Sequence, residues 1–264
     1  MIIYKSKDEI ENIKKSNQIV GKILSELKSM IEPGITTKEL DRYAEKRALE
    51  FGARPAFKGY RGFPASLCTS INEEIVHGIP SSRELKNGDI ISLDFGVEFN
   101  GLYGDAAVSC PVGEVSAKAK ELIMVAEEAF FKGFETIKKG KRLSDISHAI
   151  QIHVESFGFS VIRTFVGHGI GYSLHEDPQI PNFGPPGHGP VLKAGMVLAI
   201  EPMISMGDWQ VEILEDDWTA ITRDRSLSAH YEHTLAITEN GPIILSQVED
   251  EQLSGKETKE IQNA

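Results

Sequence analysis

The chain has 264 residues, of which 41% are hydrophobic and 25% are charged, and these are ordinary proportions for a globular protein. Its formal net charge of −11 argues against a nucleic-acid-binding surface, which is normally basic. The two cysteines, Cys68 and Cys110, are too few for a disulfide framework, and no apolar stretch approaches the roughly 18 residues that a membrane span needs. We therefore expect a cytoplasmic protein that binds neither membranes nor specific nucleic-acid sequences.

Two amphipathic helices are predicted at the start of the chain. Ser6-Lys-Asp-Glu9 is a capping box ahead of a run of apolar residues at helical spacing, and the helix is expected to end at Pro33-Gly34. A second capping box, Thr36-Thr-Lys-Glu39, predicts a shorter helix that ends at Gly52.

The next part of the chain indicates strands. Residues 53–66 are rich in Gly, Pro and aromatic side chains and are interpreted as a loop, and residues 67–79 alternate imperfectly. A short apolar run then ends at Asp94, and Asn100-Gly101 separates it from a run that carries Asp105. Because Asn-Gly between two apolar runs is a strong hairpin signal, both carboxylates are expected to reach one point across a hairpin.

The second part of the chain repeats this order. Helices are predicted over residues 116–138 and 144–157, and a Gly- and Pro-rich segment follows over residues 161–190. Another apolar run ends at Glu201, and residues 229–238, which include Glu232, are interpreted as the last long strand. The polar residues from 249 onward show no apolar period and are interpreted as a disordered tail.

An internal repeat accounts for this parallel order. Leu85-Lys-Asn-Gly-Asp-Ile-Ile-Ser-Leu-Asp94 and Leu192-Lys-Ala-Gly-Met-Val-Leu-Ala-Ile-Glu201 share Leu, Lys and Gly at matched places, and each copy ends in a carboxylate. Two copies are too few for a solenoid, which needs at least about three. We therefore predict an α+β fold with a single domain over residues 1–248, built from two facing halves at about 8–113 and 114–248, and a polar tail at 249–264.

Four carboxylates and one imidazole are candidates for a metal site between these halves: Asp94, Asp105, His168, Glu201 and Glu232. Each acid taken alone is more often a cap or turn residue, but acids at matched places in a repeat are not explained by unrelated caps. Four negative charges in one cavity need counter-charge, which two divalent ions supply. An oxygen-rich set with one imidazole suits Mn, Fe, Co or Zn.

Two further histidines, His230 and His233, flank Glu232 in the sequence. We expect both side chains on the opposite face of the strand from Glu232, and therefore outside the ligand set.

Seven motifs, taken in order, resemble those of the type I methionine aminopeptidases over about residues 4–248. They are Val76-His77-Gly-Ile-Pro80, Ser92-Leu-Asp94-Phe-Gly96, Gly104-Asp105-Ala-Ala107, Gly167-His168-Gly-Ile-Gly171, Leu174-His175-Glu-Asp-Pro178, Ala199-Ile-Glu201-Pro202 and Tyr231-Glu232-His-Thr234. The resemblance implies the pita-bread fold, whose two pseudo-symmetric halves face each other. It also implies that Asp105 and Glu232 bridge two metal ions, that Asp94 holds one ion, and that His168 and Glu201 hold the other.

The resemblance assigns substrate-side roles as well. His77 and His175 would contact the scissile amide and the tetrahedral intermediate, and Glu201 would also shuttle a proton. A pocket for the methionine side chain would be formed by Tyr60, Phe63, Cys68 and Trp218. An acceptor beside His175 should fix the tautomer of its ring, and Glu176 and Asp177 are the local candidates.

The function that the resemblance implies is a hydrolase that removes the N-terminal methionine of nascent polypeptides when a small residue follows it. The expected cofactors are two Co, Mn, Fe or Zn ions, and the expected state is a cytoplasmic monomer that contacts the ribosome transiently. Two alternatives remain open at this point, namely an X-Pro aminopeptidase or prolidase, and a non-catalytic binding paralogue of the same fold. Such a paralogue usually loses metal ligands, whereas this sequence keeps every candidate.

Overall fold

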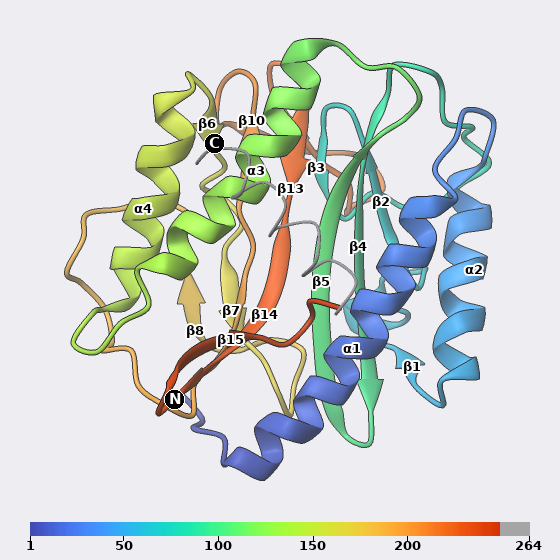
Figure 1. Ribbon diagram of the computed structural model, residues 1–264. Coiled ribbons are helices and arrows are strands. Elements are labelled where there is room, and N and C mark those ends of the chain that lie inside the picture. Colours follow the sequence, from blue (N-terminus) through green and yellow to red (C-terminus); the bar gives the residue numbers. More distant parts are fainter. Residues whose placement is uncertain (249–264) are drawn as a thin grey trace, which may run out of the picture.

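Four α-helices lie on one face of a large antiparallel sheet in the computed structural model, which describes residues 1–248 (Figure 1). The predicted tail over residues 249–264 lies outside the described residues. Across residues 1–248, none of the helices has the length and apolar character that crossing a membrane requires. The helices are α1 (Lys7–Ser29), α2 (Thr37–Glu50), α3 (Ala117–Glu135) and α4 (Leu143–Ser156).

The large sheet has nine strands in the order β1-β4-β5-β14-β9-β7-β8, with β2 also paired to β4 and β15 also paired to β14. Its strands are β1 (Arg54–Pro55), β2 (Cys68–Ile71), β4 (Ile90–Phe99), β5 (Leu102–Pro111), β7 (Gly167–Gly169), β8 (Glu176–Ile180), β9 (Val197–Ile200), β14 (Glu232–Thr238) and β15 (Gly241–Ile244).

Two small sheets of three strands each complete the strand set. One has the order β13-β10-β6 and the other the order β11-β12-β3. Their strands are β3 (Glu74–Val76), β6 (Ser160–Val161), β10 (Met203–Ser205), β11 (Val211–Ile213), β12 (Ala220–Thr222) and β13 (Ser228–His230).

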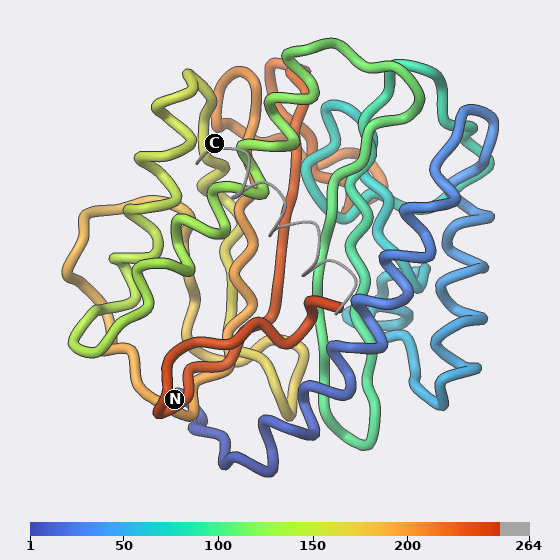
Figure 2. The backbone as a smooth tube through the Cα atoms, viewed as in Figure 1, coloured from blue at the N-terminus to red at the C-terminus, as the bar shows by residue number. Residues whose placement is uncertain are grey.

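The two helix pairs occupy opposite sides of the central strands β5 and β14, as the course of the backbone in Figure 2 shows. The pair α1 and α2 packs over β4 and β5, with Val20, Leu24 and Leu27 in one apolar cluster with Leu93 and Phe95. The pair α3 and α4 packs in a second cluster on the same face, over β9 and β14. The β4–β5 and β9–β14 pairs are both antiparallel, and β5 pairs with β14 where the two sides meet.

Local chemistry explains where the first helices begin. Ser6 and Glu9 form a reciprocal capping box at α1, and Thr36 and Glu39 form another at α2, as the sequence predicts. In each box the hydroxyl accepts a backbone N–H and the carboxylate accepts the N–H of the cap residue, which satisfies donors that the helix leaves free.

The structure corrects several predicted strands. The strand predicted to end at Asp94 continues as β4 to Phe99, so Asp94 lies in mid-strand. The loop predicted over 53–66 includes β1 and a short 3-10 helix, Tyr60–Gly62, and the segment 161–190 includes β6, β7 and β8. These short strands are held by neighbours far away in the sequence, so no local period marks them.

The last predicted strand, 229–238, is divided in two. A break at Tyr231 separates β13, which pairs with β10 in a small sheet, from β14, which pairs with β9 in the large one, and the register is the same on both sides, with Met203 opposite His230 and Ile200 opposite His233. The chain makes the matching passage from β9 to β10 at Glu201-Pro202. Glu201 and Glu232 therefore lie at the two places where the chain crosses from one sheet to another.

Candidate metal centre and adjoining pocket

The β4–β5 hairpin places two carboxylates side by side. Its turn, Asn100-Gly101, has positive φ at both residues (55° and 80°), as the predicted two-residue hairpin requires. Asp94 pairs with Ala107, and Gly96 pairs with Asp105. Asp94 and Asp105 are therefore diagonal neighbours on one face of the hairpin, because residues two apart on a strand point the same way.

The neighbouring strands bring the other candidates to the same face. Glu232 also pairs with Ala107, so the small side chain of Ala107 lies between those of Asp94 and Glu232. Further along the sheet, His168 pairs with Ala199. Glu201 is two residues beyond Ala199 and points to the same side.

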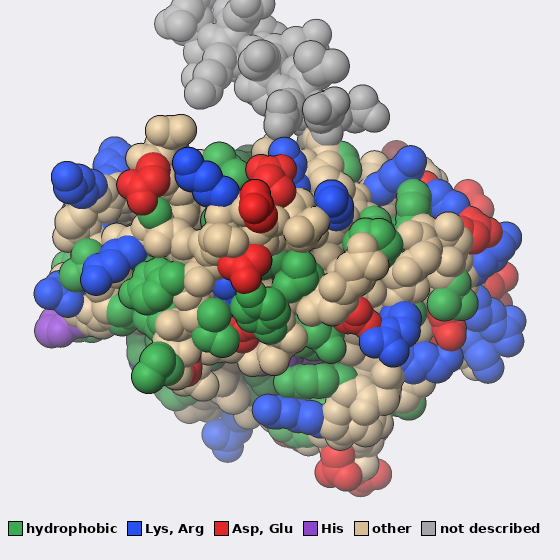
Figure 3. All heavy atoms as spheres, turned by 90° about the horizontal axis from the view of Figure 1, so that it is seen from below, with side chains coloured by type: hydrophobic (Ala, Val, Ile, Leu, Met, Phe, Trp, Pro, Cys, Tyr) green, Lys and Arg blue, Asp and Glu red, His purple; other side chains and the backbone are tan. Residues whose placement is uncertain are grey.

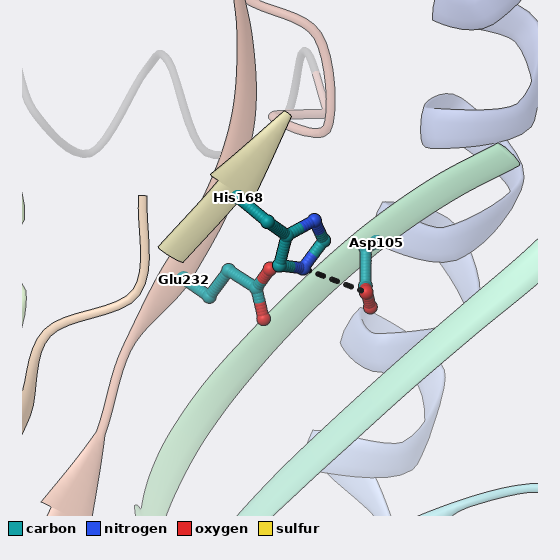
Figure 4. A group of neighbouring side chains, drawn as sticks. All are labelled: Asp105, His168 and Glu232. Carbon is teal, nitrogen blue, oxygen red and sulfur yellow. Dashed lines mark ion pairs between the residues drawn. The ribbon is translucent and has the colours of Figure 1, made fainter. Parts of the chain in front are cut away.

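The donor atoms of three residues on three different strands lie within 4.8 Å of one another: Asp105, His168 and Glu232 (Figure 4). The Nε2 atom of His168 is 3.9 Å from Oδ2 of Asp105 and 3.4 Å from Oε1 of Glu201. Asp94 and Glu201 line the same cavity. All five predicted ligands therefore face one space, although they come from segments up to 138 residues apart.

The ring of His168 is held in the tautomer that a metal ligand needs. Its Nδ1 atom is 2.9 Å from the carbonyl oxygen of Gly169, so Nδ1–H donates and the Nε2 lone pair faces the carboxylates. Burial lowers the pKa of His168 to about 4, which keeps the imidazole neutral.

The carboxylates have the electrostatics of an ion site. Burial raises the pKa of Asp94 to about 7, and burial together with the neighbouring acids raises the pKa values of Asp105, Glu201 and Glu232 well above their ordinary range. Within residues 1–248, buried oxygens of Asp94, Asp105 and Glu232 have no hydrogen-bond partner. Buried polar atoms are almost always satisfied, and divalent cations would satisfy these oxygens and balance the charge. The donor set therefore fits the predicted ions.

A cavity of about 260 Å³ adjoins these residues. It is lined by the candidate ligands and by Tyr60, Phe63, Cys68, His77, His175 and Trp218, which are the predicted substrate-side residues. Phe63 and Trp218 meet edge to face, with ring centroids 5.1 Å apart, and Cys68 is buried beside them. Phe57, Phe165 and Leu174 also line the cavity, and no sequence motif singled out Phe57 or Phe165.

His77 has a strained backbone. Its φ of 61° lies in the left-handed region, and the next residue, Gly78, is so close to strand β2 that a Cβ atom there would be 2.2 Å from the carbonyl oxygen of Thr69. The imidazole meets Phe165 and Trp218 edge to face. Strain of this kind is concentrated at functional sites, where the surrounding structure holds one side chain in place.

His175 has a different partner from the one predicted. Its Nδ1 atom is 2.9 Å from the hydroxyl oxygen of Tyr60, and the two rings stack with centroids 5.2 Å apart. Glu176 instead accepts from the buried ammonium group of Lys5 and from the backbone N–H groups of Tyr172 and Ser173. Glu176 thus fixes the loop that carries His175, and Tyr60 contacts the ring.

His230 is where the sequence prediction is wrong. Its Nε2 atom is 3.8 Å from Oε2 of Glu232 and 4.0 Å from Oε2 of Glu201, so the ring is beside the carboxylates and not on the opposite face. His230 is two residues before Glu232, an even offset that puts both side chains on the same face, and the register is unbroken across Tyr231. His233 does point away as predicted, and its ring bonds to Tyr231 and Ser246.

The fold and this donor set define a family. Residues 11–239 match the family described as metallopeptidase family M24, and the chain belongs to that family, whose pita-bread fold it has. It is similar to a methionine aminopeptidase from Clostridium perfringens, with 55% identity over 248 residues that cover 94% of this chain and 100% of the relative.

Solved structures show the same relationship. The structure of a methionine aminopeptidase from Thermotoga maritima has 51% identity and a TM-score of 0.92, and the match covers 94% of this chain and 100% of that one. A prolidase from Pyrococcus furiosus has 26% identity and a TM-score of 0.75, and the match covers 94% of this chain but 66% of that one. The chain is thus a hydrolase whose length matches the methionine aminopeptidases.

Removing metal should make the stability of the protein fall as pH rises. The folded-state pKa values of the four acids exceed their unfolded values near 4, so the folded state keeps protons that the unfolded state has released. The resulting loss begins above about pH 4 and is largely complete for Asp94 about one pH unit above its folded-state pKa of about 7, and the raised pKa values of the other three acids act in the same direction. Buried histidines act in the opposite direction only below about pH 6.5, where unfolded histidine binds protons.

The informative window therefore begins near pH 6.5, where unfolded histidine has lost its protons, and spans the folded-state pKa of Asp94 at about 7. After dialysis against a chelator, we expect the melting temperature to fall by roughly 2–4 °C or more between about pH 6.5 and about pH 8. Saturating Mn²⁺ should abolish most of that fall, because bound cations balance the ionised acids. Thermal melts followed by circular dichroism give the melting temperature at each pH with and without Mn²⁺. An equal fall of the melting temperature with pH in the two conditions would show that the four acids are not an ion site.

Proposed function

We propose that this hydrolase removes the N-terminal methionine from proteins and peptides, using two divalent metal ions held by Asp94, Asp105, His168, Glu201 and Glu232. The observation that carries the proposal is the convergence of these donors on one face of the sheet, in the lining of a cavity of about 260 Å³ that also contains aromatic side chains and Cys68. The full-length similarity to methionine aminopeptidases supports the choice of substrate.

The bound cations, Glu201 and the two histidines each have a separate role in the proposed hydrolysis. When bound, two divalent cations supply Lewis acidity, which makes water nucleophilic near neutral pH and polarises the scissile carbonyl. Glu201 accepts a proton from the attacking water and delivers it to the leaving amine. His175 and His77 donate hydrogen bonds to the developing oxyanion and to the scissile amide, contacts that strengthen as charge develops.

The pocket determines the first residue of the substrate. Tyr60, Phe63, Cys68 and Trp218 form its apolar walls, and the polarisable, unbranched side chain of methionine suits aromatic contacts of this kind. The free α-amino group would lie toward the carboxylates. A small second residue is preferred, as the resemblance to the type I methionine aminopeptidases implies.

Two alternatives account for the site less well. An X-Pro aminopeptidase or prolidase shares the fold, but the prolidase from Pyrococcus furiosus is longer and far less similar than the methionine aminopeptidases. A non-catalytic paralogue would not retain five convergent donors with unsatisfied buried oxygens and two histidines at the same cavity.

The cellular setting follows from the substrate. We propose that the protein acts in the cytoplasm as a monomer on nascent chains that emerge from the ribosome, which it contacts only transiently. On the face seen in Figure 3, Lys and Arg side chains are interspersed with Asp and Glu side chains, a distribution that fits brief contacts better than stable binding to RNA.

A substrate panel tests the proposal. With Mn²⁺ or Co²⁺ present, Met-Ala-Ser should be cleaved with a kcat/KM that exceeds that of Leu-Ala-Ser by more than the roughly 10–200-fold that one methylene is worth. Norleucine-Ala-Ser, which is unbranched like methionine, should lie close to Met-Ala-Ser. The free amino acid is assayed in each case, and chelation should stop all three reactions.

The same panel separates the alternatives. A rate dominated by proline at the second position, with methionine dispensable, would favour the X-Pro enzymes. Cleavage of no peptide by protein with verified bound metal would favour the binding paralogue.

A further inference from the structure

His230 is a buried imidazole with no evident role in the fold. Its relative exposure is 1%, and neither ring nitrogen has a hydrogen-bond partner within residues 1–248. The other histidine of this region, His233, bonds through both of its ring nitrogens. Because buried N–H groups are nearly always satisfied, the ring of His230 calls for an explanation beyond packing.

Both backbone hydrogen-bonding groups of His230 are bonded to one hydroxyl. Its N–H donates to Oγ of Ser109 at 2.9 Å, and the same hydroxyl donates to its carbonyl oxygen at 2.9 Å. Oγ of Ser109 is also 2.7 Å from Oγ of Ser92, on the neighbouring strand β4. His230 is the last residue of β13, where the chain crosses between sheets, so these bonds fix the place from which its ring extends.

Two carboxylate oxygens that could accept a hydrogen bond from Nε2 of His230 belong to candidate ligands. They are Oε2 of Glu232 at 3.8 Å and Oε2 of Glu201 at 4.0 Å. Each separation exceeds a direct N–H···O hydrogen bond by less than about 1 Å. The terminal torsion of a glutamate is broad, so a modest rotation of either carboxylate closes that gap.

We propose that His230 is a positioning residue of the metal centre, whose Nε2–H donates to Glu201 and Glu232 and holds both carboxylates in the orientation in which they bind cations. The inference rests on the proposed metal centre and adds a residue outside the predicted ligand set. Donors of this kind, bonded to metal-binding carboxylates, tune affinity without touching the ion.

A comparison with His168 distinguishes a donor from a further ligand. The Nδ1–H of His168 is bonded to a backbone carbonyl, which leaves the Nε2 lone pair for a metal. Nδ1 of His230 has no acceptor, so nothing in residues 1–248 favours the tautomer that a ligand would need.

The test compares two variants by metal binding. H230L removes the donor, and H230Q keeps one, because the amide nitrogen of glutamine extends to about the place of Nε2. We expect H230L to weaken Mn²⁺ binding by about 10–100-fold, the usual effect of losing such a donor, and H230Q to stay within about threefold of the wild type. Binding is measured by calorimetric titration of Mn²⁺ into chelator-treated full-length protein, with metal content checked by elemental analysis.

Saturation with Co²⁺ gives a second readout. The visible spectrum of bound Co²⁺ reports its ligands, and we expect its band positions to be the same in the wild type, H230Q and H230L at saturation. H233L is the matched control, because its ring is buried on the other side of β14, and its Mn²⁺ affinity should equal that of the wild type. Circular dichroism establishes that each variant is folded, and H230A replaces H230L if leucine is not accommodated.

Three outcomes overturn the inference. If H230L bound Mn²⁺ with the affinity of the wild type, His230 would contribute only to packing. If H230Q and H230L lost Mn²⁺ affinity equally and the Co²⁺ spectrum changed, His230 would be a direct ligand. If the wild type itself bound neither Mn²⁺ nor Co²⁺, the proposed metal centre would fail first, and the inference with it.

Discussion

Replacing Asp105 by Asn is expected to remove one metal ion and nearly all turnover while leaving the fold intact. Asp105 lies on β5, is 4% exposed, and belongs to the group of donor atoms that Figure 4 shows with His168 and Glu232. One of its buried oxygens has no partner within residues 1–248. Asparagine keeps the size of the side chain but loses the charge and one of the two oxygens, so it cannot bridge two cations.

The expected loss in kcat is at least about 10²–10³-fold, the scale set by removing one electrostatic group from an active site. Metal content from elemental analysis should fall from about two ions per chain to about one, in line with a two-ion site. Asp89→Asn is a suitable control, because Asp89 accepts hydrogen bonds from Lys86 and Asn72 in the turn before β4 and lies outside the cavity. A D105N protein with the metal content and rate of the wild type would show that Asp105 is only a structural residue.

Replacing His168 by Ala and replacing His175 by Ala are expected to have different effects on metal binding and activity. The two residues are nevertheless close in sequence, and their ring centroids are 4.3 Å apart. His168→Ala should lower metal occupancy and activity together, because the Nε2 lone pair faces the carboxylates. Excess metal should restore part of the turnover. His175→Ala should bind metal as the wild type does and lose rate, since its ring contacts Tyr60 and lines the cavity.

For His175→Ala the loss should appear mainly in kcat, by about 10²–10³-fold or roughly 2.7–4 kcal/mol, because the donor acts when charge develops on the substrate. Elemental analysis beside steady-state kinetics decides between the roles. Equal metal loss in the two variants would refute the division. If kcat fell by less than twofold in His175→Ala, the ring would have no role in catalysis.

The features that could be predicted from the sequence are those encoded by neighbouring residues or by the internal repeat. The capping boxes at Ser6 and Thr36 predict helix starts because they involve residues three apart, and Asn100-Gly101 predicts a tight hairpin because it tolerates positive φ at both positions. The repeat that ends in Asp94 and Glu201 indicated two related halves. The alternation of side chains on adjacent strands then places all the candidate ligands on one face.

The rest depends on which strands become neighbours. The ring of His230 is the exception, because its even offset from Glu232, with the register unbroken across Tyr231, already puts both side chains on one face. The hydrogen-bond partner of the His175 ring is Tyr60, which is 115 residues away, and not the adjacent acids. Glu176 instead bonds to Lys5, a pairing between the start of the chain and its middle that no local pattern encodes.

Anomalous diffraction from crystals grown with Mn²⁺ would locate the pair of divalent ions that we propose is held by five side chains from both halves of the chain. We expect two anomalous peaks roughly 3.5–4 Å apart. Asp105 and Glu232 should contact both peaks, Asp94 one of them, and His168 and Glu201 the other. A single peak, or two peaks that Asp105 and Glu232 do not bridge, would contradict this account of the site.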